Sequence, residues 1–175
     1  DRWATWVEDV KDYLHALTET VPRLLIGISW GGILATAVAR RDSSLLCGLG
    51  LVCPGLFSKQ AANGLQRTAL RIARGIGLGK WYVPIPLRDP ELFTESAPAR
   101  DYVNKDPFAL WQLTISFAVE NQKLVRFATR RPQDIQIPSL LMLAGRDRIV
   151  ENEKTRQFFD RISHVNRRVL EYPDA

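Results

Sequence analysis

The sequence contains few of the residues that identify metal, redox or nucleic-acid sites. Among 175 residues there are two histidines and two cysteines, and Cys47 and Cys53 do not have CxxC spacing. A histidine–cysteine metal site is therefore not expected. Both cysteines lie in an apolar segment, so we expect a reduced, buried pair, which favours a cytoplasmic setting.

Long apolar runs and long basic runs are also absent. No stretch approaches the roughly 20 apolar residues that span a bilayer, and the charged opening "DRWATWVEDVKDYL" does not resemble a signal peptide. The net charge of +5 comes from scattered or paired arginines, such as Arg40 and Arg41, and no run forms a nucleic-acid arm. Because the first residue is not Met and a helical pattern begins at once, we expect an incomplete chain, whose targeting is then undetermined.

Hydrophobic periodicity predicts an α/β fold. Apolar residues at spacings of three and four predict an amphipathic helix over residues 3–18. Short apolar runs predict buried strands, and a stretch of small and branched residues and one later stretch predict helices between them. The strands are expected at 23–28, 45–52, 139–144 and 168–172, and the helices at 31–40 and 153–162. This alternation favours a parallel sheet flanked by helices.

The middle of the sequence, residues 56–134, has a different character. It contains no buried-strand pattern, and its "WYVPIPLRDPELF" segment is too rich in proline for a regular helix. Residues 66–76 predict a basic amphipathic helix, and residues 111–129 a long helix. We therefore expect one domain with a core of residues 1–55 and 135–175 and a helical insertion between them.

One motif carries chemistry. The segment "LLIGISWGG" places Ser29 between Gly27 and Gly31 in a G-x-S-x-G pattern, with a strand before it and a helix after it. The expected reason for both glycines is that larger side chains two residues from Ser29 would clash in so tight a turn. The Ser29 hydroxyl would then project above the sheet as a nucleophile, and the Trp30 main-chain N–H would bind an oxyanion. The alternative is a purely structural turn.

On these residues the chain resembles the α/β-hydrolase superfamily, in particular monoacylglycerol lipase-like and lysophospholipase-like enzymes of the serine aminopeptidase S33 type. The resemblance rests on "LLIGISWGG", on "IPSLLMLAGRDRIV", on "DYVNKDPF" and on the first amphipathic helix. It implies a partial α/β-hydrolase fold in which residues 56–134 form a cap. It also implies that Asp147, just past a strand, is the triad acid, the alternative being an ordinary turn aspartate.

The triad histidine is not expected within the sequence. His15 precedes the nucleophile, and His164 precedes the last strand, at the edge of a parallel sheet opposite to Ser29 and Asp147. The resemblance places the histidine in the loop after that strand, where the sequence stops at Ala175. It likewise places the second oxyanion donor before Asp1. We expect residues 1–175 alone to be nearly inactive, because loss of a triad member costs several orders of magnitude.

The expected function is that of a serine hydrolase. The resemblance implies carboxylic esters such as monoacylglycerols or lysophospholipids, and the triad needs no cofactor or metal. Two alternatives stay open: acyl transfer or peptide or thioester cleavage by the same triad, and a non-catalytic hydrolase-fold protein that binds a ligand or partner. The basic helix at 66–76 could contact a lipid surface or only cover the pocket, and the glycines at 75, 77 and 79 favour the cover because they shorten it.

Overall fold

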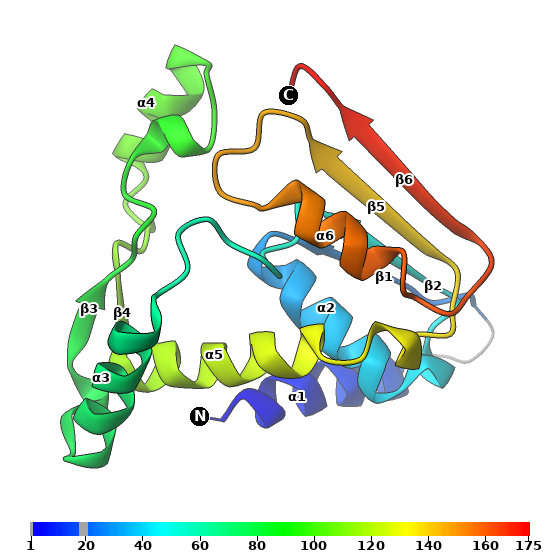
Figure 1. The fold of residues 1–175 in the computed structure, drawn as a ribbon, viewed down its shortest axis with the longest axis horizontal. Helices are drawn as coiled ribbons and strands as arrows, with labels where there is room; N and C mark the ends of the chain where they lie inside the picture. The colour runs from blue at the N-terminus through cyan, green and yellow to red at the C-terminus, as the bar shows by residue number, and fades with distance from the viewer. Residues whose placement is uncertain (1, 18–20) are drawn as a thin grey trace. The chain divides into compact units, whose positions relative to one another are not determined.

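The chain folds into two compact units. A computed structural model describes residues 2–17 and 21–175; the predicted end of the first helix, at residue 18, lies outside them. The sheet unit takes the described residues up to Lys59 together with Asn121–Ala175, and the insertion unit is Gln60–Glu120 (Figure 1). The predicted insertion extends to residue 134, whereas in the structure Leu124 and Ala128 are fully buried in the core of the sheet unit.

The sheet unit is built on four parallel strands. They are β1 (Leu24–Ile28), β2 (Gly48–Val52), β5 (Ser139–Ala144) and β6 (Arg167–Tyr172), in the order β1-β2-β5-β6. The predicted parallel α/β sheet is confirmed. Because all four strands run in the same direction, the residues that follow them gather at one edge of the sheet.

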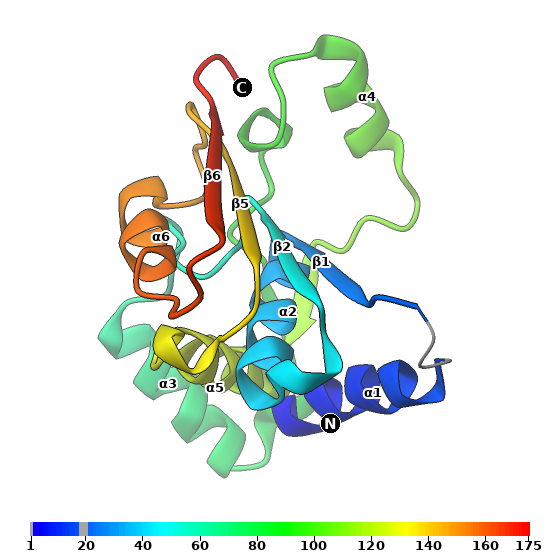
Figure 2. The same ribbon diagram turned by 90° about the vertical axis from the view of Figure 1, so that its right-hand side faces the viewer.

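Helices cover one face of this sheet. They are α1 (Trp3–Ala16), α2 (Trp30–Arg41), the second half of α5 (Ile115–Thr129) and α6 (Asn152–Phe159). Helix α2 packs closely on β1 and β2 because its buried positions are mostly small: Gly32, Ala35, Thr36, Ala37 and Ala39. Phe158 and Phe159 of α6 complete the core, and Figure 2 shows α2 and α6 on the same side of the strands.

The opposite face of β1 is apolar and exposed. Leu24, Ile26 and Ile28 of β1 are 65–69% exposed, although they alternate with the buried or half-buried Leu25 and Gly27. The prediction of a strand at 23–28 is confirmed, but the expectation that this strand is buried is wrong for one of its faces. The physical reason is that the described helices of the sheet unit lie on the other face (Figure 2).

Two further details of the sheet unit correct the sequence-based expectations. The predicted strand at 45–52 begins only at Gly48, because Ser43–Leu45 form a 3-10 helix whose first turn is capped by Asp42. Cys47 lies in the bend between them and is exposed, while Cys53 is half-buried. Both thiols are free, but the expectation that both cysteines are buried is wrong.

The insertion unit contains helices α3 and α4, the start of α5 and a pair of short antiparallel strands that are far apart in the sequence. Its elements are α3 (Gly64–Gly75), β3 (Tyr82–Pro84), α4 (Ala97–Lys105) and β4 (Gln112–Thr114), with β3 and β4 antiparallel. Short 3-10 helices cover Leu78–Lys80 and Pro90–Leu92, and another covers Pro132–Asp134 in the sheet unit. The long helix predicted from residue 111 starts at Ile115 instead, because residues 112–114 pair with β3 and the Thr114 side chain accepts a hydrogen bond from the Phe117 N–H.

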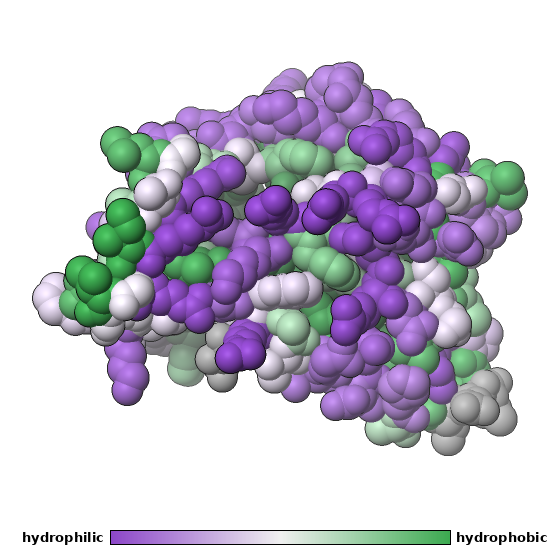
Figure 3. All heavy atoms as spheres, turned by 60° about the horizontal axis from the view of Figure 1, so that its bottom comes forward, coloured by the Kyte–Doolittle hydropathy of each residue, from purple (hydrophilic) through white to green (hydrophobic). Residues whose placement is uncertain are grey.

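Helix α3 is held at its start and at its end but has an exposed outer side. Asn63 and Gln66 form a capping box, and Arg74 makes an ion pair with the buried Glu120. The outward positions Leu65, Ile72 and Ile76 are 60–81% exposed; we call these three residues the apolar ridge. Figure 3 shows strongly hydrophobic residues at its left edge, where α3 and β3 lie. In the described part of the chain, no helix has the length and apolarity needed to cross a membrane.

Candidate active site

Ser29 occupies a strained turn between β1 and α2. Its φ of 49° and ψ of −114° are unusual for a residue with a side chain. The turn is held by main-chain hydrogen bonds: Ser29 N–H donates to the Val52 carbonyl at 3.1 Å, and the N–H groups of Gly32 and Gly55 donate to the Ser29 carbonyl at 3.0 and 2.8 Å. The Ser29 side chain does not cap the helix, and the residue is exposed. The hydroxyl is thus accessible at the carboxyl edge of the sheet.

The glycines around Ser29 do not all have the role that the sequence predicts. A Cβ on Gly27 would lie 2.4 Å from the Gly31 carbonyl oxygen, so glycine is needed there. A Cβ on Gly31 would meet nothing within 4 Å, so the expected clash at that position is wrong. The second required glycine is Gly32, whose added Cβ would lie 2.6 Å from the Cβ of Pro54. The tight contact is therefore between α2 and the loop after β2.

Trp30 begins α2, and both ends of its side chain are held. Its Nε1–H donates to Oδ1 of Asn121 at 2.9 Å, and its ring packs edge-on against Trp6 with centroids 5.8 Å apart. The Trp30 main-chain N–H belongs to the first turn of the helix, where amides point out of the helix end and the helix dipole is positive. An amide in that position can stabilise negative charge beside Ser29.

Asp147 lies in the loop after β5, at the same edge of the sheet as Ser29. Its Oδ1 accepts hydrogen bonds from the N–H groups of Ile149 and Val150, both at 2.7 Å. Lys59 Nζ donates to the Asp147 carbonyl oxygen at 2.6 Å, and Lys59 N–H donates to the Ile149 carbonyl at 2.8 Å. Both of these main-chain N–H groups donate to Oδ1, so the carboxylate is held in place through that oxygen.

Cys53, the first residue after β2, also faces this carboxylate. It has a φ of 40°, and its N–H donates to the Met142 carbonyl at 2.8 Å. Burial is the largest effect and raises the pKa of the Cys53 thiol; a hydrogen bond with the Ala144 main chain opposes it, and the charge of Asp147 and a hydrogen bond to its carboxylate raise the pKa by smaller amounts. Cys53 is therefore a neutral neighbour of Asp147 and not a thiolate nucleophile.

The residues after β6 fold back onto the loop that carries Asp147. The N–H groups of Gly145 and Arg146 donate to the carbonyl oxygens of Tyr172 and Ala175, at 2.8 and 2.7 Å. The Arg146 guanidinium also pairs with the carboxylate of Asp174 at 3.0 Å. The last residue of the sequence is thus hydrogen-bonded to the residue that precedes Asp147.

Neither histidine lies at this edge, and both are among the described residues. His15 is an exposed residue of α1. His164 precedes β6, and its Nδ1 accepts a hydrogen bond from the Asn166 N–H at 3.1 Å. Since β6 is parallel to β5, the loop before it lies at the opposite edge from Ser29 and Asp147. The structure brings Ser29, Trp30 and Asp147 to one edge but supplies no imidazole there.

Three residues at this edge of the sheet are predicted only weakly, or not at all, by the sequence. Gly32 is visible as the second glycine of "SWGG", but nothing local indicates that Pro54 packs against it. Lys59 contacts Asp147, which is 88 positions away in the sequence, and Asn121 contacts Trp30, which is 91 positions away. Such pairs arise only when the chain folds.

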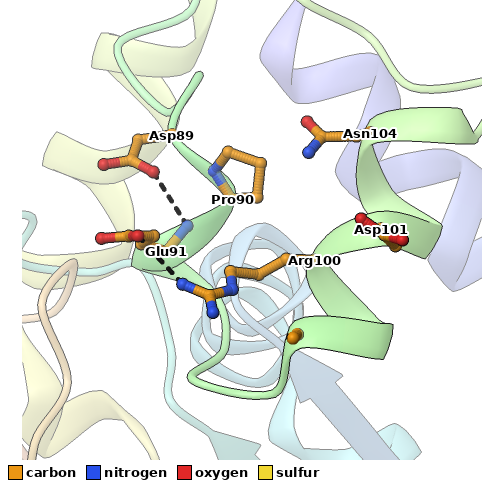
Figure 4. Close-up of a pocket in the computed structure, with 7 residues that line it drawn as sticks. Asp89, Pro90, Glu91, Arg100, Asp101 and Asn104 are labelled. Atoms are coloured by element: carbon orange, nitrogen blue, oxygen red, sulfur yellow. Dashed lines mark hydrogen bonds and ion pairs between the residues drawn. The ribbon is translucent and has the colours of Figure 1, made fainter.

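A hollow in the insertion unit is not part of this edge. Figure 4 shows it between the 3-10 helix at Pro90–Leu92 and α4, with Arg100 paired to Glu91 at 2.9 Å. Its lining is mostly polar and contains no nucleophile–base arrangement: Asp89, Pro90, Glu91, Ala97, Arg100, Asp101 and Asn104. Within the described residues, no three side chains of histidine, cysteine, aspartate or glutamate are grouped to hold a metal ion.

Comparison with known proteins extends these observations. A family model described as "Serine aminopeptidase, S33" matches residues 1–175. No individual curated protein matches the sequence. Among solved structures, a monoacylglycerol lipase from Paleococcus ferrophilus superposes with a TM-score of 0.85 at 17% identity, over 98% of this chain and 65% of that chain.

Two further solved structures have similar folds. A soluble variant of monoglyceride lipase from Saccharomyces cerevisiae, solved in complex with a substrate analogue, gives a TM-score of 0.77 at 12% identity over 97% of this chain and 59% of that one. A thermostable carboxyl esterase from Bacillus coagulans gives 0.71 at 15% identity over 98% of this chain and 64% of that one. The chain therefore spans less than two thirds of the length of these structures.

Proposed function

Because the chain belongs to the serine aminopeptidase S33 family of α/β-hydrolases, we propose that the protein containing it is a serine esterase whose nucleophile is Ser29. The observation that carries the proposal is the strained, exposed Ser29 at the edge of the sheet where Asp147 also lies. The chemistry requires an activated hydroxyl, a donor for the oxyanion and an acid that orients a base.

The proposed reaction follows from these groups. A histidine takes the Ser29 proton while Oγ attacks the ester carbonyl, and the Trp30 N–H stabilises the oxyanion. The histidine then protonates the leaving alcohol, and water releases the acid from the acyl-enzyme by the same steps. Asp147, held through Oδ1 by two main-chain N–H groups, orients the imidazole through Oδ2.

We assign this histidine to the residues that follow Ala175. The assignment is supported by the hydrogen bond from Arg146 N–H to the Ala175 carbonyl, which keeps that part of the chain next to Asp147. Residues 1–175 alone are then expected to be nearly inactive. Esters of the monoacylglycerol or lysophospholipid class are the proposed substrates, in keeping with the lipase and esterase structures of similar fold.

The test is active-site labelling of the protein made from the complete reading frame. A fluorophosphonate probe should label the wild type at Ser29, and Ser29→Ala should remove the label and the hydrolysis of a monoacylglycerol. A folded wild-type protein that takes no label would instead indicate the non-catalytic binding protein. Parallel assays with a peptide amide and with an acceptor alcohol would separate peptidase and acyltransferase activity from ester hydrolysis.

For the insertion unit we propose a cap that touches lipid surfaces through the apolar ridge. Its support is the exposure of Leu65, Ile72 and Ile76, with the exposed aromatic residues Trp81 and Tyr82 nearby in sequence. Exposed basic residues of the same segment suit an anionic surface: Arg67, Arg71 and Lys80. The glycines at 75, 77 and 79 favoured a pocket cover because they were expected to shorten the helix, but α3 is still twelve residues long.

Vesicle binding tests this second proposal. Ile72→Asp should reduce co-sedimentation with vesicles that contain an anionic phospholipid, because it places a charge in the ridge. Val165→Asp is a matched control, since Val165 is 87% exposed in the sheet unit and lies outside the ridge. If both variants bind vesicles as well as the wild type does, the apolar ridge does not contact lipid and α3 is a pocket cover only.

A further inference from the structure

A short segment of the sheet unit contacts both the nucleophile turn and the loop that carries Asp147. It consists of residues 55–59, which lie between β2 and the start of the insertion unit; we call it the bridging segment. At its start, the Gly55 N–H donates to the Ser29 carbonyl at 2.8 Å. At its end, Lys59 is hydrogen-bonded to the loop after β5. The segment thus connects the two parts of the candidate active site directly.

The end of the bridging segment runs antiparallel to the loop after β5. Ser58 and Val150 form an antiparallel bridge, and the N–H of the next residue, Lys59, donates to the Ile149 carbonyl at 2.8 Å. These are main-chain contacts, so they hold whatever side chain stands at position 59.

Phe57 attaches the bridging segment to the core. Its ring packs against Phe158 with centroids 6.1 Å apart, and its carbonyl accepts a hydrogen bond from the Glu151 N–H at 2.8 Å. Leu56, the residue before it, is 2% exposed. Lys59 therefore continues from a firmly packed stretch of chain, although its own side chain is exposed.

The peptide group between Ile149 and Val150 joins Lys59 to the Asp147 carboxylate. A peptide group is planar, so its carbonyl and its N–H turn together. The carbonyl, on Ile149, accepts from the Lys59 N–H. The N–H, on Val150, donates to Asp147 Oδ1 at 2.7 Å. The hydrogen bond from Lys59 therefore restrains one of the two N–H groups that hold the carboxylate.

Lys59 also holds the main chain of Asp147. Its Nζ donates to the Asp147 carbonyl oxygen at 2.6 Å, while the Asp147 N–H donates to the Ala144 carbonyl at 3.2 Å. The peptide groups before and after the Asp147 Cα are thus both held, the later one by the ammonium group. Lys59 acts on Asp147 from two directions at once.

We infer that Lys59 is a positioning residue that holds Asp147 in place relative to Ser29, through its main-chain N–H and its ammonium group. The inference rests on the proposed function of Ser29 and Asp147 and adds a residue to it. Misplacement of a catalytic group by about 1 Å can lower the rate about 10²-fold. Loss of the ammonium bond alone leaves the main-chain bond and should lower kcat less, by about threefold.

The experiment compares variants of the complete protein by steady-state hydrolysis of a soluble short-chain ester. Lys59→Met removes the ammonium donor, Lys59→Arg keeps a charged donor, and Lys59→Pro removes the main-chain N–H as well. The matched controls are Lys105→Met, at an exposed lysine of α4, and Ala61→Pro, at an exposed residue before α3. The midpoint of thermal unfolding is measured for each variant.

The expected result is a kcat about threefold lower for Lys59→Met and about 10²-fold lower for Lys59→Pro, with nearly unchanged KM. Lys59→Arg and both controls should keep the wild-type kcat. In an Asp147→Asn background, the Lys59 substitutions should lower kcat no further, because Lys59 acts through that carboxylate. If Lys59→Pro does not fold, Lys59→Met decides.

Two results would overturn the inference. A purely structural role would lower the unfolding midpoint of Lys59→Met and leave the kcat of the folded enzyme unchanged. A loss of kcat that persists in full in the Asp147→Asn background would mean that Lys59 acts independently of Asp147.

The same data separate this inference from the function on which it rests. A wild type with no Ser29-dependent hydrolysis overturns the proposed esterase and the role of Lys59 with it. An active wild type with an equally active Lys59→Met variant overturns only the role of Lys59.

Discussion

The main-chain N–H of Arg146 donates a hydrogen bond to the carbonyl oxygen of Ala175 at 2.7 Å. This bond joins the loop after β5, which carries Asp147, to the chain that leaves β6. It gives a physical reason to expect the next residues of the protein beside the Asp147 carboxylate, and the first prediction follows from it.

The complete reading frame should encode a histidine within about five residues after Ala175, in the loop after the last strand. Replacing that histidine by glutamine should lower kcat by about three orders of magnitude or more, because the serine loses its base. Ester hydrolysis by the purified variant is the measurement, and Ser29→Ala gives the background. A continuation without histidine would instead point to the binding-protein function.

Gly145→Ala should disturb the contact between these two loops. Its Cβ would lie 2.7 Å from Pro173 Cα and 2.8 Å from the Pro173 carbonyl oxygen, so the backbone after β6 must shift. We expect lower esterase activity of the complete protein and a loss of stability of about 1–3 kcal/mol. Chemical denaturation and ester hydrolysis measure the two effects; Gly64→Ala, where the added Cβ meets nothing within 4 Å, is the control. Wild-type behaviour of both variants would show that the loops are not in contact.

Alanine substitutions of the glycines around Ser29 should have clearly different effects on the stability of the protein. Gly27→Ala and Gly32→Ala place a Cβ at 2.4 and 2.6 Å from fixed atoms and should destabilise the protein by about 1–3 kcal/mol. Gly31→Ala should be neutral, or more stable by about 0.5–1 kcal/mol, because it adds a helix-favouring residue in open space. Urea unfolding of the three variants checks this. Equal destabilisation by Gly31→Ala would mean that both glycines of the G-x-S-x-G motif are needed, as the sequence predicts.

The two thiols should react at different rates and with different pH dependence. Cys47 is exposed and should be alkylated first by iodoacetamide. Because burial and the charge of Asp147 raise the pKa of Cys53, its thiolate forms only at a pH above that of an ordinary cysteine, and its labelling should begin correspondingly later along a pH series.

Asp147→Asn tests the contribution of the Asp147 charge to the pKa of Cys53. Removing the negative charge should lower the pKa of Cys53, so its alkylation should begin at a lower pH than in the wild type, while the labelling of Cys47 should not change. Mass spectrometry of the two cysteine peptides gives both rates. An unchanged pH dependence for Cys53 would mean that the charge of Asp147 does not affect its reactivity.

The features that the sequence predicts correctly are local. The run "SLLMLA" became β5 at its predicted bounds, and the strand–serine–helix pattern around Ser29 became a strained turn. Apolar periodicity and glycine spacing predict such elements because they act between residues only a few positions apart. The same locality explains why the start of α5 was misplaced: Gln112–Thr114 become a strand only because they pair with Tyr82–Pro84.

The amino-acid sequence is sufficient to predict the α/β alternation, the nucleophile motif and an aspartate after a strand. The folded chain is needed to see which glycine is crowded, which face of β1 is covered, and that Asn121 accepts the hydrogen bond of the Trp30 indole. These outcomes depend on contacts between residues that are distant in the chain, such as Gly32 with Pro54 and Gly145 with Pro173. Contacts of this kind form only when the strands align side by side, and no pattern in a short window of residues encodes them.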